Sequence, residues 1–321
     1  MPWLVGIDEA GYGPNLGPLV MTAVVCRVPP DLADINLWQV LRAAVRRARS
    51  RNTQKLLIED SKLVYSPARG LLELERSVLS ALFADLLAGT VCSLGRYVDA
   101  VSPHTHPELR NEAWYTGRST LPAEAEPTDC AQAAERFRRA CTARGITWGP
   151  VRSEVVCPAR FNALLEHWGS KAASLGVALA NLLRVGLVLD GDDTVTFLID
   201  KHGGRNCYAA LLQHAIPEGL VLAYDERSAR SFYKVHGLGR EVHIVFAPRA
   251  DGTYLPVALA SMVSKYLREV LMREFNDFWQ DHVPGLRPTA GYPGDADRFL
   301  EEIRPALARL AIPETAVWRR R

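Results

Sequence analysis

Acidic residues follow three of the apolar runs in the sequence, and these are the side chains best suited to chemistry. Asp8 and Glu9 end the first run, Asp200 ends a second, and Asp251 follows a third. Carboxylates at strand ends can converge on one edge of a sheet, where they repel one another unless hard cations lie between them. Oxygen ligands without His or Cys favour Mg²⁺ or Mn²⁺, and a pair of such ions suits attack on a phosphodiester. Acids in solvated loops are the alternative at this point.

The segment 6–18, Gly-Ile-Asp-Glu-Ala-Gly-Tyr-Gly-Pro-Asn-Leu-Gly-Pro, sharpens this hypothesis. Adjacent residues of a strand point to opposite faces, so Asp8 and Glu9 can share one site only if the strand breaks near them. Gly11 and Gly13 permit such a break, and they leave backbone N–H groups open to a sugar or a phosphate. An ordinary turn between two buried strands is the alternative.

The elements that position these acids follow from hydrophobic periodicity and from turn residues. The order of the predicted elements indicates one α/β fold with a mixed sheet, followed by a helical tail. The predicted strands are 3–7, 19–28, 194–200 and 241–246. The predicted helices are 32–57, 66–88, 161–188, 207–214 and a long helix from Pro256 to beyond Phe278. Residues 99–150, rich in Pro and small residues, are predicted to be irregular.

Composition excludes several classes of protein. The chain has 321 residues, of which 48% are hydrophobic and 23% charged, so neither a disordered nor a collagen-like chain fits. A net charge of +2 neither predicts nor excludes a polyanionic partner. The six cysteines form no CxxC pair, which argues against a zinc site or a disulfide framework. With no secretory signal and no apolar stretch of membrane-spanning length, we expect a cytoplasmic protein that does not enter a membrane.

Five separated motifs resemble those of the type 2 ribonuclease H enzymes, and they occur in the same order. The resemblance covers most of the chain except about residues 96–155, which look like an insertion relative to the family. The motifs are Asp-Glu-Ala-Gly-Tyr-Gly at 8–13 with Gly17-Pro18, Asp60-Ser61-Lys62, Phe-Leu-Ile-Asp at 197–200, Arg-Ala-Asp-Gly-Thr-Tyr-Leu-Pro at 249–256 with the helix that carries Ser261, Lys265, Arg268 and Glu269, and Gly291-Tyr292.

The resemblance implies a ribonuclease H-like mixed β-sheet flanked by helices. It implies a catalytic domain over residues 1–285, with the insertion at 96–155, and a helical C-terminal extension over 286–321. By position, Asp8, Glu9, Asp200 and Asp251 would be the catalytic and metal-binding carboxylates, holding two Mg²⁺ or Mn²⁺ ions. Family members cleave the RNA strand of RNA–DNA hybrids, or cut at ribonucleotides in duplex DNA, and leave 5′-phosphate and 3′-hydroxyl ends.

The resemblance also implies substrate-binding residues. The backbone of Gly11, Tyr12 and Gly13 and the ring of Tyr292 would recognise the ribonucleotide, whose 2′-hydroxyl distinguishes RNA from DNA. Lys62, Lys265 and Arg268 would bind backbone phosphates, with Ser261 as a further substrate-binding residue. Without the family context, Tyr292 would be a core aromatic and the cations solvated surface charges.

The sequence departs from the family pattern in its recognition elements, whereas the four acids are intact. Tyr12 replaces an Arg and so removes a fixed charge and a bidentate phosphate contact. Glu269 replaces an Asp, and Gly294 and Asp297 stand where a Thr and a His are usual. The segment 201–206, Lys-His-Gly-Gly-Arg-Asn, replaces a shorter turn; its basic residues either supply the lost phosphate contacts or are merely solvated.

The sequence therefore predicts a monomeric, metal-dependent endonuclease whose partner is an RNA–DNA hybrid or a ribonucleotide-containing DNA duplex. Two alternatives remain open. One is a nuclease of the same fold with a changed nucleic-acid substrate, which the altered recognition elements favour. The other is a non-catalytic protein that binds hybrids, which the four intact acids disfavour.

Overall fold

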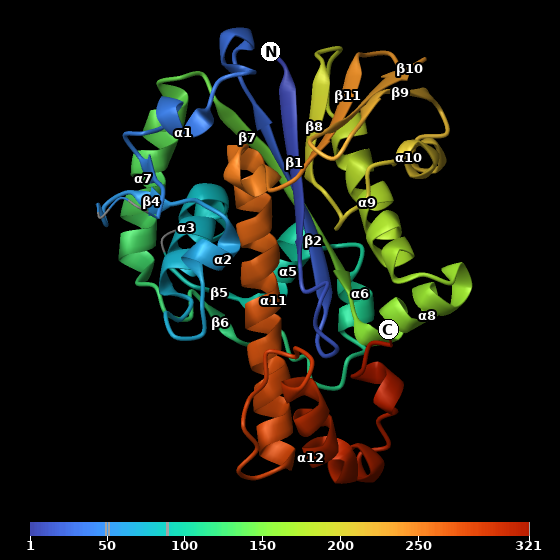
Figure 1. The fold of residues 1–321 in the computed structure, drawn as a ribbon. Coiled ribbons are helices and arrows are strands. Elements are labelled where there is room, and N and C mark those ends of the chain that lie inside the picture. The colour runs from blue at the N-terminus through green and yellow to red at the C-terminus, as the bar shows by residue number, and fades with distance from the viewer. Residues whose placement is uncertain (49, 51, 88–89, 321) are drawn as a thin grey trace.

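A seven-stranded mixed sheet forms the centre of the molecule (Figure 1). The computed structural model describes the chain except residues 49, 51, 88–89 and 321. The strand order is β7-β2-β1-β8-β11-β10-β9, in which the β1–β8 and β8–β11 pairs are parallel and the other pairs are antiparallel. The strands are β1 (Trp3–Ala10), β2 (Leu19–Arg27), β7 (Thr147–Val156), β8 (Val195–Asp200), β9 (Leu220–Glu226), β10 (Ser231–His236) and β11 (Val242–Ala247).

The register around β1 explains how adjacent acids can lie at one sheet edge. Strand β1 pairs with β2 as far as Ala10, but its pairing with β8 ends at Ile7. Asp8 and Glu9 therefore have a strand neighbour on one side only. The predicted break at Asp8 and Glu9 is therefore wrong, because β1 continues through both residues to Ala10 and the turn begins only at Gly11, with φ of +86°.

Helices cover both faces of the sheet. The longest helix, α11, packs directly on β1, because a Cβ at Gly6 would lie 2.2 Å from the Pro256 carbonyl carbon and only glycine fits. The α-helices are α1 (Leu37–Val40), α2 (Ser61–Val64), α3 (Leu72–Leu82), α4 (Ala84–Leu87), α5 (Leu94–Val101), α6 (His106–Leu109), α7 (Pro127–Thr142), α8 (Pro158–Trp168), α9 (Lys171–Leu187), α10 (Ala209–Ala215), α11 (Leu255–His282) and α12 (Asp295–Arg309). Short 3₁₀ turns are η1 (Pro30–Leu32), η2 (Ala250–Gly252) and η3 (Glu314–Ala316), and β3 (Val45–Arg46), β4 (Leu56–Leu57), β5 (Cys92–Ser93) and β6 (Thr120–Leu121) form two small ribbons.

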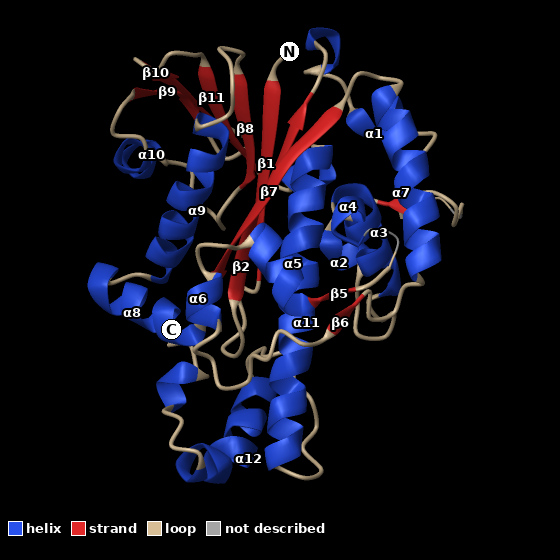
Figure 2. Ribbon diagram, turned by 180° about the vertical axis from the view of Figure 1, so that it is seen from behind, coloured by secondary structure: helices blue, strands red, loops and turns tan. Residues whose placement is uncertain are grey.

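The hydrophobic core has two parts, one on each face of the sheet. One part joins α11 to α3, α5, α7 and α12, and the other packs α8, α9 and α10 against the opposite face (Figure 2). The strands between them are buried on both faces, which explains why β1 and β2 read as continuous apolar runs.

The fold-class prediction of a mixed α/β sheet flanked by helices is confirmed, with corrections to individual elements. Residues 32–57, predicted as helix, contain only η1, α1, β3 and β4 among their described residues; positions 49 and 51 lie outside them. The expected irregular stretch at 99–150 is instead ordered, with α6, β6, α7 and the beginning of β7, an edge strand of the main sheet. The division at residue 285, and the insertion relative to the family, stay predictions.

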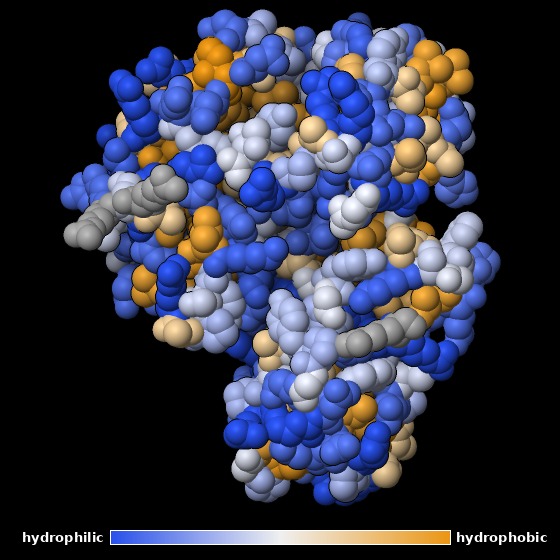
Figure 3. Space-filling view, viewed as in Figure 1, coloured by the Kyte–Doolittle hydropathy of each residue, from blue (hydrophilic) through white to orange (hydrophobic). Residues whose placement is uncertain are grey.

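Hydrophilic residues dominate the face that α11 crosses, and the hydrophobic ones there are scattered in small groups (Figure 3). Over the described part of the chain, we find no helix with the length and apolar character that crossing a bilayer requires.

Candidate metal-binding active site

The four predicted acids come from three neighbouring elements of the sheet. Asp8 and Glu9 lie near the end of β1, Asp200 is the last residue of β8, and Asp251 lies in η2 just after β11. Because β1, β8 and β11 are parallel neighbours, their carboxyl ends meet at one edge. The η2 turn is held to that edge because the Ala250 N–H donates to Asp200 Oδ1 at 2.7 Å.

Asp8 lies on the face of β1 that α11 covers. It is buried, with 6% of its surface exposed, and its Oδ1 accepts the Glu9 N–H at 2.7 Å. The Ser264 hydroxyl donates to the Asp8 backbone oxygen at 3.0 Å and fixes α11 against the strand. Ser261, a predicted substrate-binding residue, lies one turn earlier and lowers the pKa of Asp8 by hydrogen bonding.

The electrostatics show that the carboxylates act on one another. Burial raises the pKa of Asp8 well above its usual range, with further contributions from the charges of Glu9, Asp200 and Asp251. Burial and the Asp200 charge raise the pKa of Glu9 to about 7. The four acids therefore form one electrostatic group, as the sequence predicted, and their full ionisation is costly without cations.

A fifth acid, Asp60, belongs to the same group and was not among the predicted site residues. Burial, followed by the charges of Asp60 and Asp200, raises the pKa of Asp251 to about 6. Asp60 caps α2, since its Oδ1 accepts the Lys62 N–H at 2.9 Å. The Asp60-Ser61-Lys62 motif contains this acid, but only Lys62 of the motif is predicted to be a site residue.

Lys62 is the predicted cation that the structure places among these acids. Its charge lowers the pKa values of Glu9, Asp200 and Asp251 against the effect of burial. The side chain is exposed, and its predicted phosphate contact stays a prediction.

The turn 11–13 lies beside Tyr292, as the resemblance implied. A Cβ at Gly13 would lie 3.8 Å from Tyr292 Cε1, and the tyrosine is 51% exposed. The two segments are also joined through the backbone, because Asn15 N–H donates to Gly291 O at 2.7 Å. Tyr292 is therefore not a core aromatic and remains open to a ligand.

Tyr12, which stands in place of the family's Arg, points toward α9. Its ring lies 4.8 Å from the Nζ of Lys171, the first residue of that helix. Burial and the charge of Glu9 raise the pKa of Tyr12. A cation is therefore present beside this position, but it comes from another element.

Lys265 and Arg268 are held by neighbouring groups on α11. Lys265 Nζ donates to Glu269 Oε1 at 2.5 Å and lies 4.6 Å from the ring centre of Tyr65. Arg268 is 1% exposed and donates to the carbonyl oxygens of Leu16 at 3.3 Å and Ala290 at 3.0 Å. Arg268 thus packs against the turn 11–13 at Gly11, and the predicted phosphate contacts of both residues stay predictions.

The basic segment after Asp200 is not simply solvated, because Lys201 is buried, and its predicted phosphate contacts stay predictions. Lys201 is 8% exposed and donates to Asn206 Oδ1 and Arg227 O, each at 2.7 Å. Burial, together with the Arg205 charge, lowers the pKa of His202 to about 4, so the imidazole is neutral near pH 7. The Lys201 side chain holds the segment in place, whereas His202 Nε2 has no hydrogen-bond partner among the described residues.

The donor set fits a hard divalent cation. One buried carboxylate oxygen, Glu9 Oε2, has no hydrogen-bond partner, which is unusual for a buried polar atom. Oxygen donors with mutually raised pKa values are the environment that Mg²⁺ or Mn²⁺ relieves. As they are placed, however, no group of three or more His, Cys, Asp or Glu side chains among the described residues could hold a metal ion.

Comparisons with known proteins add structural likenesses only. No family model and no curated protein matches the sequence. The chain is similar in fold to ribonucleases HII and HIII. A chain in the PCNA:RNase HII complex from Archaeoglobus fulgidus matches with a TM-score of 0.44 and 16% identity, over 99% of this chain and 94% of that one.

Two further solved structures give similar values. Ribonuclease H2 from Pyrococcus horikoshii OT3 matches with a TM-score of 0.43 and 16% identity, over 98% of this chain and 92% of the other. Bst-RNase HIII in complex with Mn²⁺ matches with a TM-score of 0.42 and 14% identity, over 98% of this chain and 65% of the other. These are type 2 enzymes, the family whose motifs the sequence resembles.

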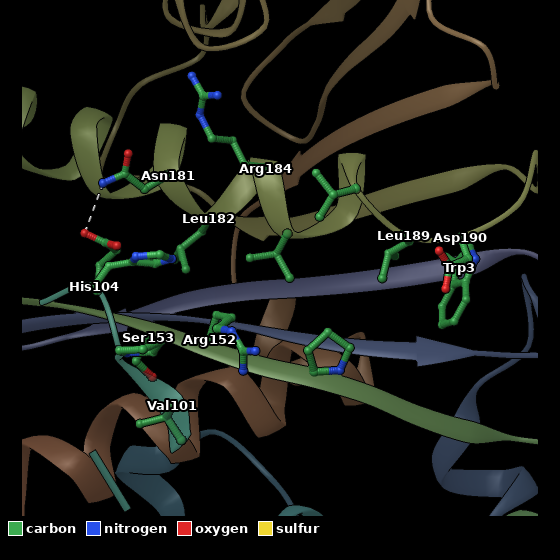
Figure 4. A pocket seen from close by; sticks show the side chains of 15 residues that line it. Trp3, Val101, His104, Arg152, Ser153, Asn181, Leu182, Arg184, Leu189 and Asp190 are labelled. Carbon is green, nitrogen blue, oxygen red and sulfur yellow. Dashed lines mark hydrogen bonds between the residues drawn. The ribbon is translucent and has the colours of Figure 1, made fainter. Parts of the chain in front are cut away.

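A separate cavity of about 760 Å³ lies between α9 and β7 (Figure 4). Apolar side chains line most of it, and its polar part includes Glu154, whose Oε2 accepts from Asn181 Nδ2 at 3.1 Å. None of the carboxylates at the sheet edge lines this cavity. The cavity is therefore separate from the carboxylates at the sheet edge.

Proposed function

We propose that the protein is a metal-dependent endonuclease that hydrolyses the RNA strand of RNA–DNA hybrids, or cuts at ribonucleotides in duplex DNA. The products would carry 5′-phosphate and 3′-hydroxyl ends. The observation that carries the proposal is the convergence of Asp8, Glu9, Asp200 and Asp251, whose charges raise one another's pKa values.

Asp8, Glu9, Asp200 and Asp251 would hold two Mg²⁺ or Mn²⁺ ions. Bound there, such ions lower the pKa of a water molecule and neutralise the charge that develops on the leaving oxygen. The protein's own contribution is positioning. Ser264 fixes β1 against α11, and Ala250 fixes η2 against Asp200. These bonds hold the elements that carry the acids, and such positioning is what phosphoryl chemistry depends on.

Recognition of the ribonucleotide would fall to the turn 11–13 and to Tyr292. Gly13 is exposed and has only the Tyr292 ring near it, and that exposed ring can pack on a neighbouring sugar. Lys62 would bind a phosphate next to the acids. The short distance between Tyr292 and Gly13 supports a joint role of the ring and the turn in recognising the ribonucleotide.

The test is cleavage of three labelled duplexes: an RNA–DNA hybrid, DNA carrying one ribonucleotide, and plain DNA. Each is incubated with Mg²⁺ or Mn²⁺ and either the wild-type protein or Asp8→Asn. The proposal expects cleavage of one or both RNA-containing duplexes by the wild type and none by the variant. Equal cleavage by the variant would refute the site.

A second candidate is a nuclease of the same fold with another substrate, which the Tyr12 position favours. In that case plain or branched DNA is cut and the RNA-containing duplexes are not. Tight binding of a hybrid without cleavage under either metal would indicate the non-catalytic binder instead.

A further inference from the structure

A groove of about 520 Å³ runs along α9 and α10, beside the end of α8. Figures 1 and 2 both show α10 beside α9, with α8 beyond the first residues of α9. The two helices approach closely at Gly176, where a Cβ would lie 2.8 Å from Leu211 Cδ1. Most of the α9 residues that line the groove have small side chains, namely Ala172, Ala173, Gly176 and Ala180. The groove is therefore lined mainly by helix surface that no long side chain of α9 covers.

The segments that form this groove carry cations and no acid. Residues 167–189 and 201–217 contain neither Asp nor Glu, although the chain has 36 such residues. Among the described residues that line the groove, the charged ones are Arg184 and Arg205. A concentrated positive patch attracts polyanions even when the net charge of the chain is only +2. The charge of the groove is thus complementary to a polyanion.

Both arginines are open to such a ligand. Arg184 of α9 is exposed, and within the described part of the chain its guanidinium group has no hydrogen bond and no ion pair. Arg205 is partly exposed, its Nε donates to Cys207 O at 2.9 Å, and its guanidinium carbon lies 5.1 Å from the ring centre of Tyr208. A planar guanidinium that is not already paired with a carboxylate can bind two phosphate oxygens at once.

An exposed aromatic ring lies at the rim of the groove. Trp168, the last residue of α8, is 50% exposed, and its ring centre lies 6.2 Å from that of His214 of α10. An aromatic platform beside a positive groove is the combination that binds single-stranded nucleic acid, because bases stack on the ring and cations follow the backbone. The bases of a duplex are stacked on one another and cannot reach such a ring. The groove therefore fits an unpaired strand better than a duplex.

The groove begins next to the candidate site. Ser170 lines it, and the following residue, Lys171, has its Nζ 4.8 Å from the ring of Tyr12 in the turn 11–13. From Ala172 to Arg184, helix α9 rises by about 18 Å. A strand that leaves the sheet edge beside Tyr12 can therefore follow α9 for several nucleotides.

We propose that the groove between α9 and α10 binds an unpaired strand that continues from a duplex held at the sheet edge. Trp168 stacks on a base of this strand, and Arg184 and Arg205 bind its phosphates. This inference rests on the proposed function, because it takes the substrate at the sheet edge to be nucleic acid. It adds a preference for substrates with a single-stranded tail, which the four carboxylates alone do not give.

The test compares a blunt RNA–DNA hybrid with hybrids that carry an unpaired tail of about six nucleotides at one end of one strand. Binding to the full chain is measured by fluorescence anisotropy in EDTA, so that metal-dependent cleavage does not interfere. We expect the best placed tail to strengthen binding by the wild type about tenfold, the order of effect of one stacked base. Trp168→Ala should remove most of this gain, and Trp168→Phe should keep most of it because a ring remains.

The charge is tested by a salt series on the same hybrids. Arg184→Gln should reduce the slope of log affinity against log salt by about 0.7 for the tailed hybrid and leave the slope for the blunt hybrid unchanged. Arg184→Lys should restore the slope. The matched controls are Tyr224→Ala on β9, where the tyrosine is 57% exposed, and Arg138→Gln on α7, where the side chain is 72% exposed. Neither control should change the gain from the tail.

Three results would overturn the proposal. The first is equal affinity of the wild type for the blunt hybrid and for every tailed hybrid. The second is a weakening by Trp168→Ala that is the same for blunt and tailed hybrids and comes with a lower unfolding temperature, which would make Trp168 a structural residue. The third is no gain from any tail while a labelled Glu-rich peptide binds the wild type and not Arg184→Gln, which would assign the groove to an acidic peptide.

Cleavage of the same hybrids in Mg²⁺ or Mn²⁺ separates this inference from the proposed function. If the tail strengthens binding through Trp168 but neither hybrid is cut, the endonuclease is wrong and the groove stands. If both hybrids are bound and cut equally well and Trp168→Ala changes neither, the endonuclease stands and the groove is wrong.

Discussion

Two groups of buried carboxylates in this molecule behave in opposite ways. Glu75 of α3 is fully buried and accepts the N–H groups of Ala123 and Glu124 at 2.7 Å and of Ala125 at 2.8 Å, together with the Tyr266 hydroxyl at 2.7 Å. At the sheet edge, Glu9 Oε2 has no partner at all. The same chemical group is saturated in one place and left open in the other.

Glu274 of α11 repeats the saturated pattern. It accepts five hydrogen bonds from the loop 116–119, at 2.6 to 3.2 Å. Burial alone would raise its pKa, but the bonds from Ser119 and from the backbone of Thr116 and Gly117 outweigh burial and lower it. At the sheet edge burial and mutual repulsion both act upward. Saturated carboxylates hold the chain together, whereas under the proposed function the open ones would bind cations.

The largest expected effect is on cleavage, and it should be confined to the open group. Asp200→Asn removes one donor and one repelling charge, so activity should fall by about 100-fold or more, as when a group that stabilises the transition state is lost. Its unfolding temperature in EDTA should stay the same or rise, because the remaining acids are repelled less. Initial rates and thermal unfolding of the same preparation check both. A clearly lower unfolding temperature for Asp200→Asn would show that Asp200 stabilises the fold, as the saturated carboxylates do.

The next effect is on stability, and it should be confined to the saturated group. Glu75→Gln leaves buried N–H groups of the loop 123–125 without a charged acceptor, and should cost about 3 kcal/mol of unfolding free energy. Denaturant unfolding measures the loss. Cleavage by the remaining folded protein should match the wild type, and a selective fall in its rate would show that Glu75 is tied to the chemistry.

That Asp8, Glu9 and Asp200 lie at one sheet edge follows from the strand pattern, whereas their metal-binding role stays a prediction. Asp8, Glu9 and Asp200 stand at the ends of apolar runs, and parallel neighbours bring such ends together. Asp60 was missed as a site acid, since its place depends on how α2 docks on α11 through Ser61 and Ser261, a contact across 200 positions.

The saturated carboxylates and the packing of residues 317–320 on loop 14–16 could not be predicted in this way. Glu75 and Glu274 look like ordinary helix acids, and only the path of the loops 116–125 shows that they are buried. Arg319 resembles a residue of a basic terminus until the segment 317–320 is placed on loop 14–16. Residues 32–57 were wrongly predicted to be a helix, because the charge pattern of a solvated helix is a weak signal where tertiary contacts decide the structure.

A smaller effect is expected on the pH dependence of stability, and it distinguishes the open carboxylates from the saturated ones. The pKa of Glu9 rises from its ordinary 4.5 to about 7. A raised carboxyl pKa means that the native state binds the proton more tightly than the unfolded state. Its stabilising contribution is therefore complete below about pH 4.5 and is lost as pH rises through about 7.

Unfolding temperatures in EDTA at pH 5 and pH 7 test this, with Glu9→Gln as the matched variant. The wild type should lose more stability than Glu9→Gln between the two values, and Mg²⁺ should remove most of the difference. If both proteins change in parallel with and without Mg²⁺, the Glu9 carboxyl is not part of an open group.

The smallest effect is expected at Glu269, which lies near the site but belongs to the saturated kind. Although burial opposes it, the charges of Lys265 and Arg268 lower its pKa, and Tyr65 donates to it at 2.7 Å. Glu269→Gln should cost about 1 to 2 kcal/mol of stability, because the acceptor remains but its charge is lost. Cleavage should change only a few-fold, since no donor of the open group is touched. Denaturant unfolding and initial rates on the hybrid check both values. If Glu269→Gln loses as much cleavage as Asp200→Asn, Glu269 belongs with the open carboxylates. The role of a carboxylate in this protein would then depend on its distance from the sheet edge and not on how many hydrogen bonds its neighbours donate to it.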